Sequence, residues 1–414
     1  MHHFILPTQD SFISSGSLLR DKNFGNDGIL ELKKVFQHNS FEYQTQALVN
    51  FAGTDFTEMS KSVSSGDIPS NAEYYLRLFE AEGTSELSEE YILSAHPLWK
   101  SWVEGSGKST DNPKNTNGVS WENRNDIKNG GAISWSYTDG AREVAIAGDL
   151  DLNGVSFDEF HVAFGSSSQP FGNVTSSNFL GGNDKDDKGG VWINRPGYIA
   201  SQSFSSQATD VEMNVTDMVN KWLGGTISNY GLILKFSGSQ ETDSTTFGHL
   251  KFFARESQTI FQPKLEVRWD DHSPCTGSNT GSMNELTMTG LDDNYLYMRN
   301  LRNSYKENDK IKFRVGARKR YKTKSVSTSV QSITDSYISE GSGSYAIKDV
   351  ATDEFIVPFS EYTLIGCDNL GAYFNQWLNG FYINRDYKIL LKLKTDDGQE
   401  QIFDDNFKFT VERK

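Results

Sequence analysis

Short apolar runs separated by turn residues constrain the fold of this chain most. Residues 72–79 and 230–236 are apolar runs of strand length, and residues 265–269 alternate apolar and polar side chains with a period of two. Gly, Asn, Asp and Ser stand between such runs through the first 270 residues. Aromatic residues, which favour strands, make up 13% of the chain. This pattern predicts an all-β fold.

One segment has helical periodicity instead. Val215, Met218, Val219 and Trp222 are spaced as i, i+3, i+4 and i+7, and Thr216 or Asp217 can cap the start. A pair of glycines follows at 224–225 and is expected to end the helix. The sequence therefore predicts one short helix at 217–223.

A change in residue pattern near position 270 divides the chain into two parts. Residues 270–290 lack apolar periodicity and are rich in Ser, Thr, Gly and Asn, as linkers are. Beyond them, residues 310–315, 387–394 and 406–411 place apolar side chains on one face and basic or polar ones on the other, and Asp396, Asp397 and Gly398 form a hairpin signal. We expect a β domain at 1–270, a linker at 271–293 and a small β-sandwich at 294–414.

Charge separates the two parts. The chain holds 40 Lys and Arg against 55 Asp and Glu, a formal charge of −15, which argues against nucleic acid as a partner. The acidic excess lies mainly in the N-terminal part, whereas a basic run follows the linker: Arg314, Arg318, Lys319, Arg320, Lys322 and Lys324. A solvated strand face is the simplest interpretation of this run, and contact with an acidic protein is the alternative.

Cysteines and terminal signals exclude further classes. Cys275 and Cys367 lie far apart in the sequence, which indicates neither a disulfide framework nor a cysteine-based zinc site. The first residues show no basic stretch followed by a long apolar one, and no window approaches about 18 consecutive apolar residues. We therefore expect no signal peptide, no transmembrane segment and no membrane partner.

One segment resembles a calcium loop. Asp149, Asp151 and Asn153 occupy relative positions 1, 3 and 5, and Gly154 occupies position 6, as in an EF-hand. The twelfth position is Phe160, so the bidentate carboxylate is missing there. A bare turn is the preferred interpretation and a Ca²⁺ site the alternative. No other cofactor is expected.

Catalytic motifs are absent from the sequence. It contains no Gly-x-Ser-x-Gly, no His-Glu-x-x-His and no glycine-rich phosphate loop, so we expect no enzymatic activity. Trp99, Trp102 and Trp121 lie in or beside a long polar segment. Capping of the end of a sandwich core is the preferred interpretation of these rings, and stacking of exposed indole rings on sugars is the alternative.

Several collinear segments resemble a DNRLRE-type domain, a β-sandwich related to carbohydrate-binding modules. They are residues 18–25, 46–51, 70–78, 99–102, 120–122, 211–222, 229–235, 252–256 and 262–267. The resemblance implies a jelly-roll-like sandwich with one short helix over residues 1–270. It also implies an alternative function, recognition of a host surface glycan, with Trp99, Trp102 and Trp121 as the stacking residues.

Residues 294–320 and 373–381 resemble the C-terminal part of virion structural proteins of contractile-tailed, marine T4-like phages. This resemblance implies a non-enzymatic neck, tail or baseplate component, located in the virion, whose partners are other virion structural proteins. The expected docking residues are Tyr295, Tyr297, Arg299, Tyr305, Arg318, Lys319, Arg320 and Lys322.

Overall fold

A computed structural model of the chain describes most of its length. The described residues are 1–37, 40–82, 90–127, 131–135, 180–182, 189–205, 210–241, 243, 245–246, 248–321, 326, 328–330, 333–395 and 397–413. Strands dominate and only two α-helices are present in this part of the chain, so the predicted all-β fold is confirmed.

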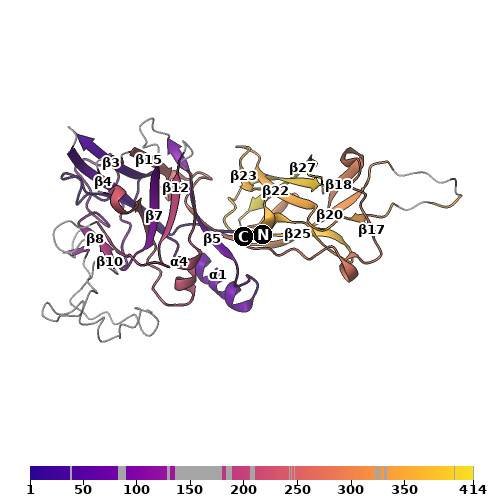
Figure 1. Ribbon diagram of the computed structural model, residues 1–414. Helices are drawn as coiled ribbons and strands as arrows, with labels where there is room; N and C mark the ends of the chain where they lie inside the picture. Colours follow the sequence, from indigo (N-terminus) through magenta and orange to yellow (C-terminus); the bar gives the residue numbers. More distant parts are fainter. Residues whose placement is uncertain are drawn as a thin grey trace. The chain divides into compact units, whose positions relative to one another are not determined.

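The chain forms two compact units (Figure 1). Residues 5–266 make the N-terminal unit, and residues 267–414 together with 1–4 make the C-terminal unit. The division falls close to residue 270, where the sequence predicts a domain boundary. However, the first four residues belong to the unit built from the end of the chain, which the sequence pattern does not indicate.

A large antiparallel sheet forms most of the N-terminal unit. Its strands, in spatial order, are β12 (Ala200–Phe204), β7 (Tyr91–Pro97), β14 (Leu232–Phe236), β4 (Ser40–Asn50), β3 (Ile29–Gln37), β15 (Gly248–Phe253) and β6 (Glu80–Glu82), and β2 (Gln9–Ser14) also pairs with β4. β14 is buried along its whole length, which explains why its residues are apolar rather than alternating, except for Lys235, which pairs with Glu241.

A smaller sheet accompanies it. Its order is β1 (His2–Ile5), β16 (Lys264–Arg268), β5 (Glu73–Leu78) and β13 (Val211–Asn214). Residues 2–4 of β1 and the last two residues of β16 are assigned to the C-terminal unit. The N-terminal unit also contains two hairpin-like pairs: β8 (Asn123–Ile127) with β9 (Gly131–Ser134), and β10 (Leu180–Gly182) with β11 (Val191–Ile193). Short 3-10 turns occur at η1 (Gly238–Glu241) and η2 (Arg255–Ser257).

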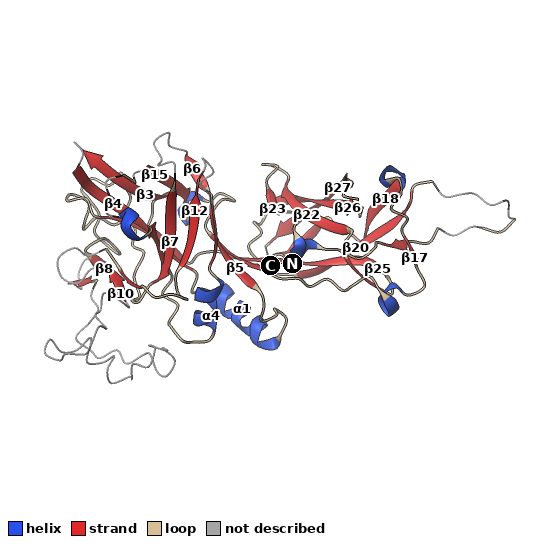
Figure 2. Cartoon of the chain, in the orientation of Figure 1, coloured by secondary structure: helices blue, strands red, loops and turns tan. Residues whose placement is uncertain are grey.

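Two helices lie side by side in the N-terminal unit (Figure 2). The predicted one is α4 (Thr216–Leu223), which buries Met218, Val219 and Trp222 as its spacing requires. The other, α1 (Thr54–Ser65), contacts it through Phe56 and Trp222, whose ring centroids are 6.2 Å apart. The sequence analysis did not predict α1, because its residues are mostly polar and its buried face is narrow.

The C-terminal unit is a two-sheet sandwich. One sheet runs β18 (Asn294–Arg299), β20 (Lys310–Lys319), β25 (Gly371–Trp377) and β24 (Gly366–Asp368); the other runs β19 (Ser304–Lys306), β27 (Glu400–Glu412), β26 (Arg385–Lys394), β22 (Gly343–Asp349) and β23 (Phe355–Val357). β17 (Asn284–Glu285) pairs with β21 (Ser336–Tyr337), and 3-10 turns form at η3 (Gly277–Thr280), η4 (Leu291–Asp293) and η5 (Glu361–Thr363). A single apolar core joins residues of both sheets.

The predicted hairpin is present. β26 and β27 pair antiparallel from Lys394 and Glu400 outward, and the Gly398 amide donates to the Thr395 carbonyl oxygen at 2.9 Å. The predicted linker at 271–293 differs from expectation. Leu286 and Leu291 are buried in the core of the sandwich, so this segment is an integral part of the C-terminal unit.

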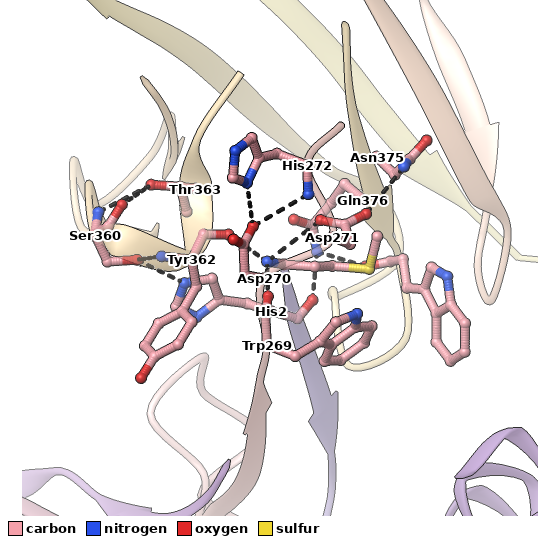
Figure 3. Close-up of polar contacts among 12 residues, drawn as sticks. His2, Trp269, Asp270, Asp271, His272, Ser360, Tyr362, Thr363, Asn375 and Gln376 are labelled. Carbon is pink, nitrogen blue, oxygen red and sulfur yellow. Dashed lines mark hydrogen bonds and ion pairs between the residues drawn. The ribbon is translucent and has the colours of Figure 1, made fainter. Parts of the chain in front are cut away.

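The first residues are held inside the C-terminal unit (Figure 3). The Met1 amino group donates to the carbonyl oxygens of Trp269 and Tyr362, and its nitrogen is 3.5 Å from the Asp271 carboxylate. The Gln376 side-chain amide donates to the His2 carbonyl oxygen at 2.7 Å. Phe4 is buried and packs against Phe381. These contacts explain why residues 1–4 group with the far end of the chain.

Candidate docking surface

The register of β18, β20 and β25 places cations and aromatic rings on one face of their sheet. Directly opposite residues of antiparallel strands point to the same side. Tyr295 lies opposite Arg318, and Arg299 lies opposite Arg314. The alternate residues of β20, among them Phe313 and Val315, are buried in the core.

We call this surface the cation–aromatic face. It comprises Tyr295, Tyr297, Arg299, Lys310, Lys312, Arg314, Arg318, Arg320, Tyr373 and Trp377. Sequence reasoning missed two lysines of β20, Lys310 and Lys312, and the two rings of β25, Tyr373 and Trp377. The i, i+2 spacing of Lys310, Lys312 and Arg314 was a signal for the lysines, whereas no local signal places β25 beside β20.

Cation–π contacts link these side chains. The Lys312 ammonium lies 3.6 Å from the centre of the Tyr373 ring, and Lys310 lies 5.0 Å from that of Trp377. The Arg318 guanidinium lies 4.9 Å from the centre of the Tyr295 ring. Each such contact at an exposed site contributes about 0.5–1 kcal/mol.

Glycine at position 316 creates the space for one ring. Tyr297 lies opposite Gly316, and a Cβ atom there would come within 2.3 Å of the Tyr297 ring. The ring therefore lies flat over the β20 backbone and stacks on Tyr295, with centroids 5.7 Å apart. The Tyr297 hydroxyl donates to Asp335 at 2.8 Å. Burial is the main cause that raises the pKa of Tyr297, and the hydrogen bond to the Asp335 carboxylate adds to it.

Two carboxylates neutralise part of the face. Asp335 pairs with Arg299, and Asp368 pairs with Lys312 and Arg314. Although burial acts to raise the pKa of Asp368, hydrogen bonds from these cations and from the Leu370 amide hold it well below its usual range. Among the described residues, Lys310, Arg318 and Arg320 contact rings and have no carboxylate at ion-pair distance.

The remaining predicted docking residues fall elsewhere. Tyr305 lies on β19 of the other sheet, and its half-buried ring packs edge-on against Phe313 and Phe409 of the core, so it lies apart from the cation–aromatic face. Lys319 alternates to the opposite side from Arg318, and its ammonium donates to the Thr289 carbonyl oxygen at 3.0 Å. Lys322 lies outside the described residues.

Two of the three tryptophans considered for sugar stacking are interior. Trp102 and Trp121 are buried, and the Trp102 indole donates to the Tyr230 carbonyl oxygen at 2.9 Å. Gly189 packs directly on the Trp121 ring. Trp99 is half-buried. A buried ring offers no face to a sugar, so the burial of Trp102 and Trp121 agrees with the preferred interpretation, a place in the core. The calcium-loop residues Asp149, Asp151 and Asn153 lie outside the described residues.

Three carboxyl groups of the N-terminal unit converge at a point that the sequence did not single out. Oxygen atoms of Asp10, Glu104 and Glu256 all lie within 4.8 Å of one another, the one such group of metal-ligating side chains among the described residues. The Arg255 guanidinium lies 2.7 Å from the Glu104 carboxylate, and the Arg255 backbone amide donates to the Asp10 carboxylate at 2.7 Å.

Electrostatics shape this cluster. Asp10 is almost completely buried, and that burial, with the neighbouring Glu256 and Glu104 carboxylates, raises its pKa well above the usual range. Burial also raises the pKa of Glu104, against the effect of Arg255. Three carboxylate oxygens are a ligand set that suits a hard divalent cation, and the Arg255 guanidinium supplies one positive charge beside them.

A groove opens elsewhere on the same unit. It has a volume of about 360 Å³ and is lined by Phe12, Asp27, Ile29, Glu31, Ala81, Glu82, Ser109, Lys251 and Phe253. Apolar side chains lie beside carboxylates there, and Glu31 lies 3.4 Å from the His249 ring. Although burial opposes it, this contact lowers the pKa of Glu31, which is ionised at neutral pH.

Comparisons with protein-family models, with curated proteins and with solved structures found no match. No helix in the described part of the chain is both long and apolar enough to cross a membrane. The class that the structure itself defines is an all-β protein of two units, the second of which is a two-sheet sandwich with a cationic outer face.

Proposed function

We propose that the protein is a non-enzymatic structural subunit of a tailed-phage virion, which docks through its cation–aromatic face to an acidic surface of a neighbouring virion protein. One observation carries the docking part of this proposal. Six cations and four aromatic rings occupy one sheet face, against two paired carboxylates. The virion setting rests on the resemblance of residues 294–320 and 373–381.

Charge and composition favour a protein partner. Arginine and tyrosine are the residues that protein interfaces concentrate at their energetic centres, and a cationic patch selects an acidic partner and speeds its association. The rings hold the arginine side chains in place before binding, which lowers the entropy cost of ordering them. Lys310, Arg318 and Arg320 are the cations with no described carboxylate beside them, so we assign them the principal contacts.

Particle incorporation tests the proposal. In infections that depend on a supplied copy of the gene, we expect Arg318→Gln/Arg320→Gln to lower the copies per purified particle at least tenfold, measured by quantitative mass spectrometry. Lys388→Gln/Lys392→Gln removes the same charge from β26 in the other sheet and serves as the matched control. Equal incorporation of both double variants, with both folded, would exclude docking through this face.

A second candidate function is carbohydrate recognition, favoured by the groove beside β3 and β15. Phe12, Ile29 and Phe253 supply apolar surface, and Glu31 and Asp27 supply acceptors for sugar hydroxyl groups. A glycan array separates two locations for such a site. Loss of binding in Glu31→Gln with retention in Trp99→Ala would assign it to the groove. The opposite result would assign the sugar site to the surface around Trp99. Absence of glycan binding in the unmodified protein would exclude carbohydrate recognition.

A further inference from the structure

The two cysteines of the chain, which are far apart in sequence, lie together in the C-terminal unit. The Cys367 amide of β24 donates to the Ser273 carbonyl oxygen at 3.1 Å, and the Cys275 sulfur is 3.9 Å from the Ile365 carbonyl oxygen. The segment around residue 274 therefore runs alongside β24. Ser273, which contacts Cys367, is two residues from Cys275, and Ile365, which contacts Cys275, is two residues from Cys367. The two thiols are close enough for each to influence the pKa of the other.

The surroundings place this pair at an edge. β24 is the last strand of its sheet, and Gly366 packs so closely on Ser273 that a Cβ atom would lie 2.6 Å from the Ser273 nitrogen. Cys275 is buried, although its neighbours Pro274 and Thr276 are exposed. An irregular segment thus covers the sheet edge and closes over both sulfurs, so that opening it locally would expose the pair.

A carboxylate fixes the covering segment. Glu340 accepts the Cys275 amide at 2.6 Å through one oxygen and contacts the His272 ring at 2.6 Å through the other. Asp270 contacts the second nitrogen of that ring at 2.5 Å. Cys275 therefore occupies a defined position rather than a loop tip.

We propose that Cys275 and Cys367 form a dithiol that closes to an intramolecular disulfide by exchange with a low-molecular-weight disulfide such as oxidised glutathione. One cysteine, as thiolate, attacks a sulfur of the reagent, forms a mixed disulfide and releases one glutathione thiolate. The second cysteine then attacks the protein sulfur of that mixed disulfide and releases the other glutathione thiolate. Two electrons pass from the protein to the reagent, and the two protons lost by the protein thiols end on the released glutathione.

Burial controls when the reaction occurs. It raises the pKa of both thiols, so the folded protein holds them protonated and shielded at neutral pH. Exchange therefore requires the covering segment to open, or takes place before the unit has folded. Once both sulfurs are close, the second step is intramolecular and faster than capture of another glutathione, so the mixed disulfide does not accumulate.

Closing the bond links residues on the order of 90 positions apart and restricts the unfolded chain strongly. The oxidised form is therefore expected to unfold at a temperature about 5–10 °C higher than the reduced form, provided that the sulfurs reach bonding geometry without displacing β24. The bond would pin the covering segment to the strand that carries Asp368, which pairs with two cations of the cation–aromatic face.

Refolding in glutathione buffers tests the proposal. The full chain is unfolded in urea, refolded with oxidised glutathione, quenched with an alkylating agent and digested. The expected result is a disulfide-linked peptide pair containing Cys275 and Cys367, no free thiol and a raised unfolding temperature. Native protein in the same buffer is expected to react at least tenfold more slowly, because its thiols are covered.

Single variants make the outcome decisive. Cys275→Ser and Cys367→Ser each leave one thiol, so each variant should end as a glutathione adduct or an unmodified thiol. The unfolding temperature of each variant should be the same after refolding with or without oxidised glutathione. Stable glutathione adducts or free thiols in the refolded unmodified chain would overturn the proposal. A linked chain that unfolds at a lower temperature than the reduced one would also overturn it, since the bond would then conflict with the fold.

Discussion

At the scale of single residues, a few positions decide which side chains share a surface. Gly316 is such a position, because the missing side chain lets the Tyr297 ring lie over β20. Asp10 is another, because it is a buried carboxyl group with two further carboxylates beside it. Neither role is visible from residue type alone, since glycine and aspartate are common throughout the sequence.

Gly316→Ala is expected to displace the Tyr297 ring and to weaken its bond to Asp335. Forcing an extra methyl group into a filled space costs about 1–3 kcal/mol, which urea unfolding of the full chain measures. Gly28→Ala is the control, since its Cβ atom would meet only the Ser257 Cα at 3.9 Å. Equal stability of the two variants would contradict the close packing at Gly316.

Asp10→Asn is expected to make stability less sensitive to pH. The pKa of Asp10 is higher in the folded than in the unfolded chain, so its favourable contribution is complete below the unfolded value and is lost as pH rises through the folded value. The groups facing it are Glu104, Arg255 and Glu256. The unmodified protein should therefore lose more stability than the variant between pH 5 and pH 8, the pH range we would scan.

Thermal unfolding across that range measures the difference. The Asn side chain can still accept the Arg255 amide, so the local fold should persist. Parallel pH profiles for the two proteins would show that Asp10 does not titrate abnormally.

At the scale of elements, the local sequence pattern predicted whether a segment is a helix or a strand better than it predicted which segments belong to a domain core. Alternation at 310–315 predicted part of β20, and helical spacing at 217–223 predicted α4. The residues at 271–293 read as a linker because they lack periodicity, yet Leu286 and Leu291 are core residues. Isolated apolar side chains in an irregular segment carry no periodic signal, so only the folded chain identifies them as core.

Phe4→Ala tests the assignment of the first residues to the C-terminal unit. Truncating a buried phenylalanine costs about 3–5 kcal/mol, and the loss should fall on residues 267–414 rather than on 5–266. Hydrogen exchange resolved by peptide measures this distribution. Phe12→Ala, at an equally buried position of β2, should show the reverse pattern. The assignment would fail if Phe4→Ala increased exchange only in the N-terminal unit.

At the scale of the whole molecule, the total charge conceals an uneven distribution. Residues 1–266 carry 20 Lys and Arg against 34 Asp and Glu, whereas residues 267–414 carry 20 against 21. The cation–aromatic face then concentrates part of that positive charge on one sheet. The sequence predicted a basic run but not the aromatic rings of β25 beside it, because β25 is brought next to β20 only by the tertiary fold.

An anionic polymer tests this localisation. The full chain is expected to bind immobilised poly-glutamate at low salt despite its net charge of −15, and to be released as salt screens exposed cations beyond a Debye length of about 10 Å at 0.1 M. Arg318→Gln/Arg320→Gln should elute earlier than Lys388→Gln/Lys392→Gln. Passage of the unmodified protein through the column without delay would show that the face does not act as a cationic surface.

The sequence by itself determined the all-β class, the helix at α4, the hairpin between β26 and β27 and the approximate boundary near residue 270, because each depends on neighbouring residues along the chain. Only the tertiary structure decided that Met1–Phe4 belongs with the C-terminal unit, that Trp102 and Trp121 are buried, and that Cys275 meets Cys367. These features depend on contacts between segments that are far apart in the sequence. Period and composition report which face a side chain takes, but they do not report which distant segment covers it.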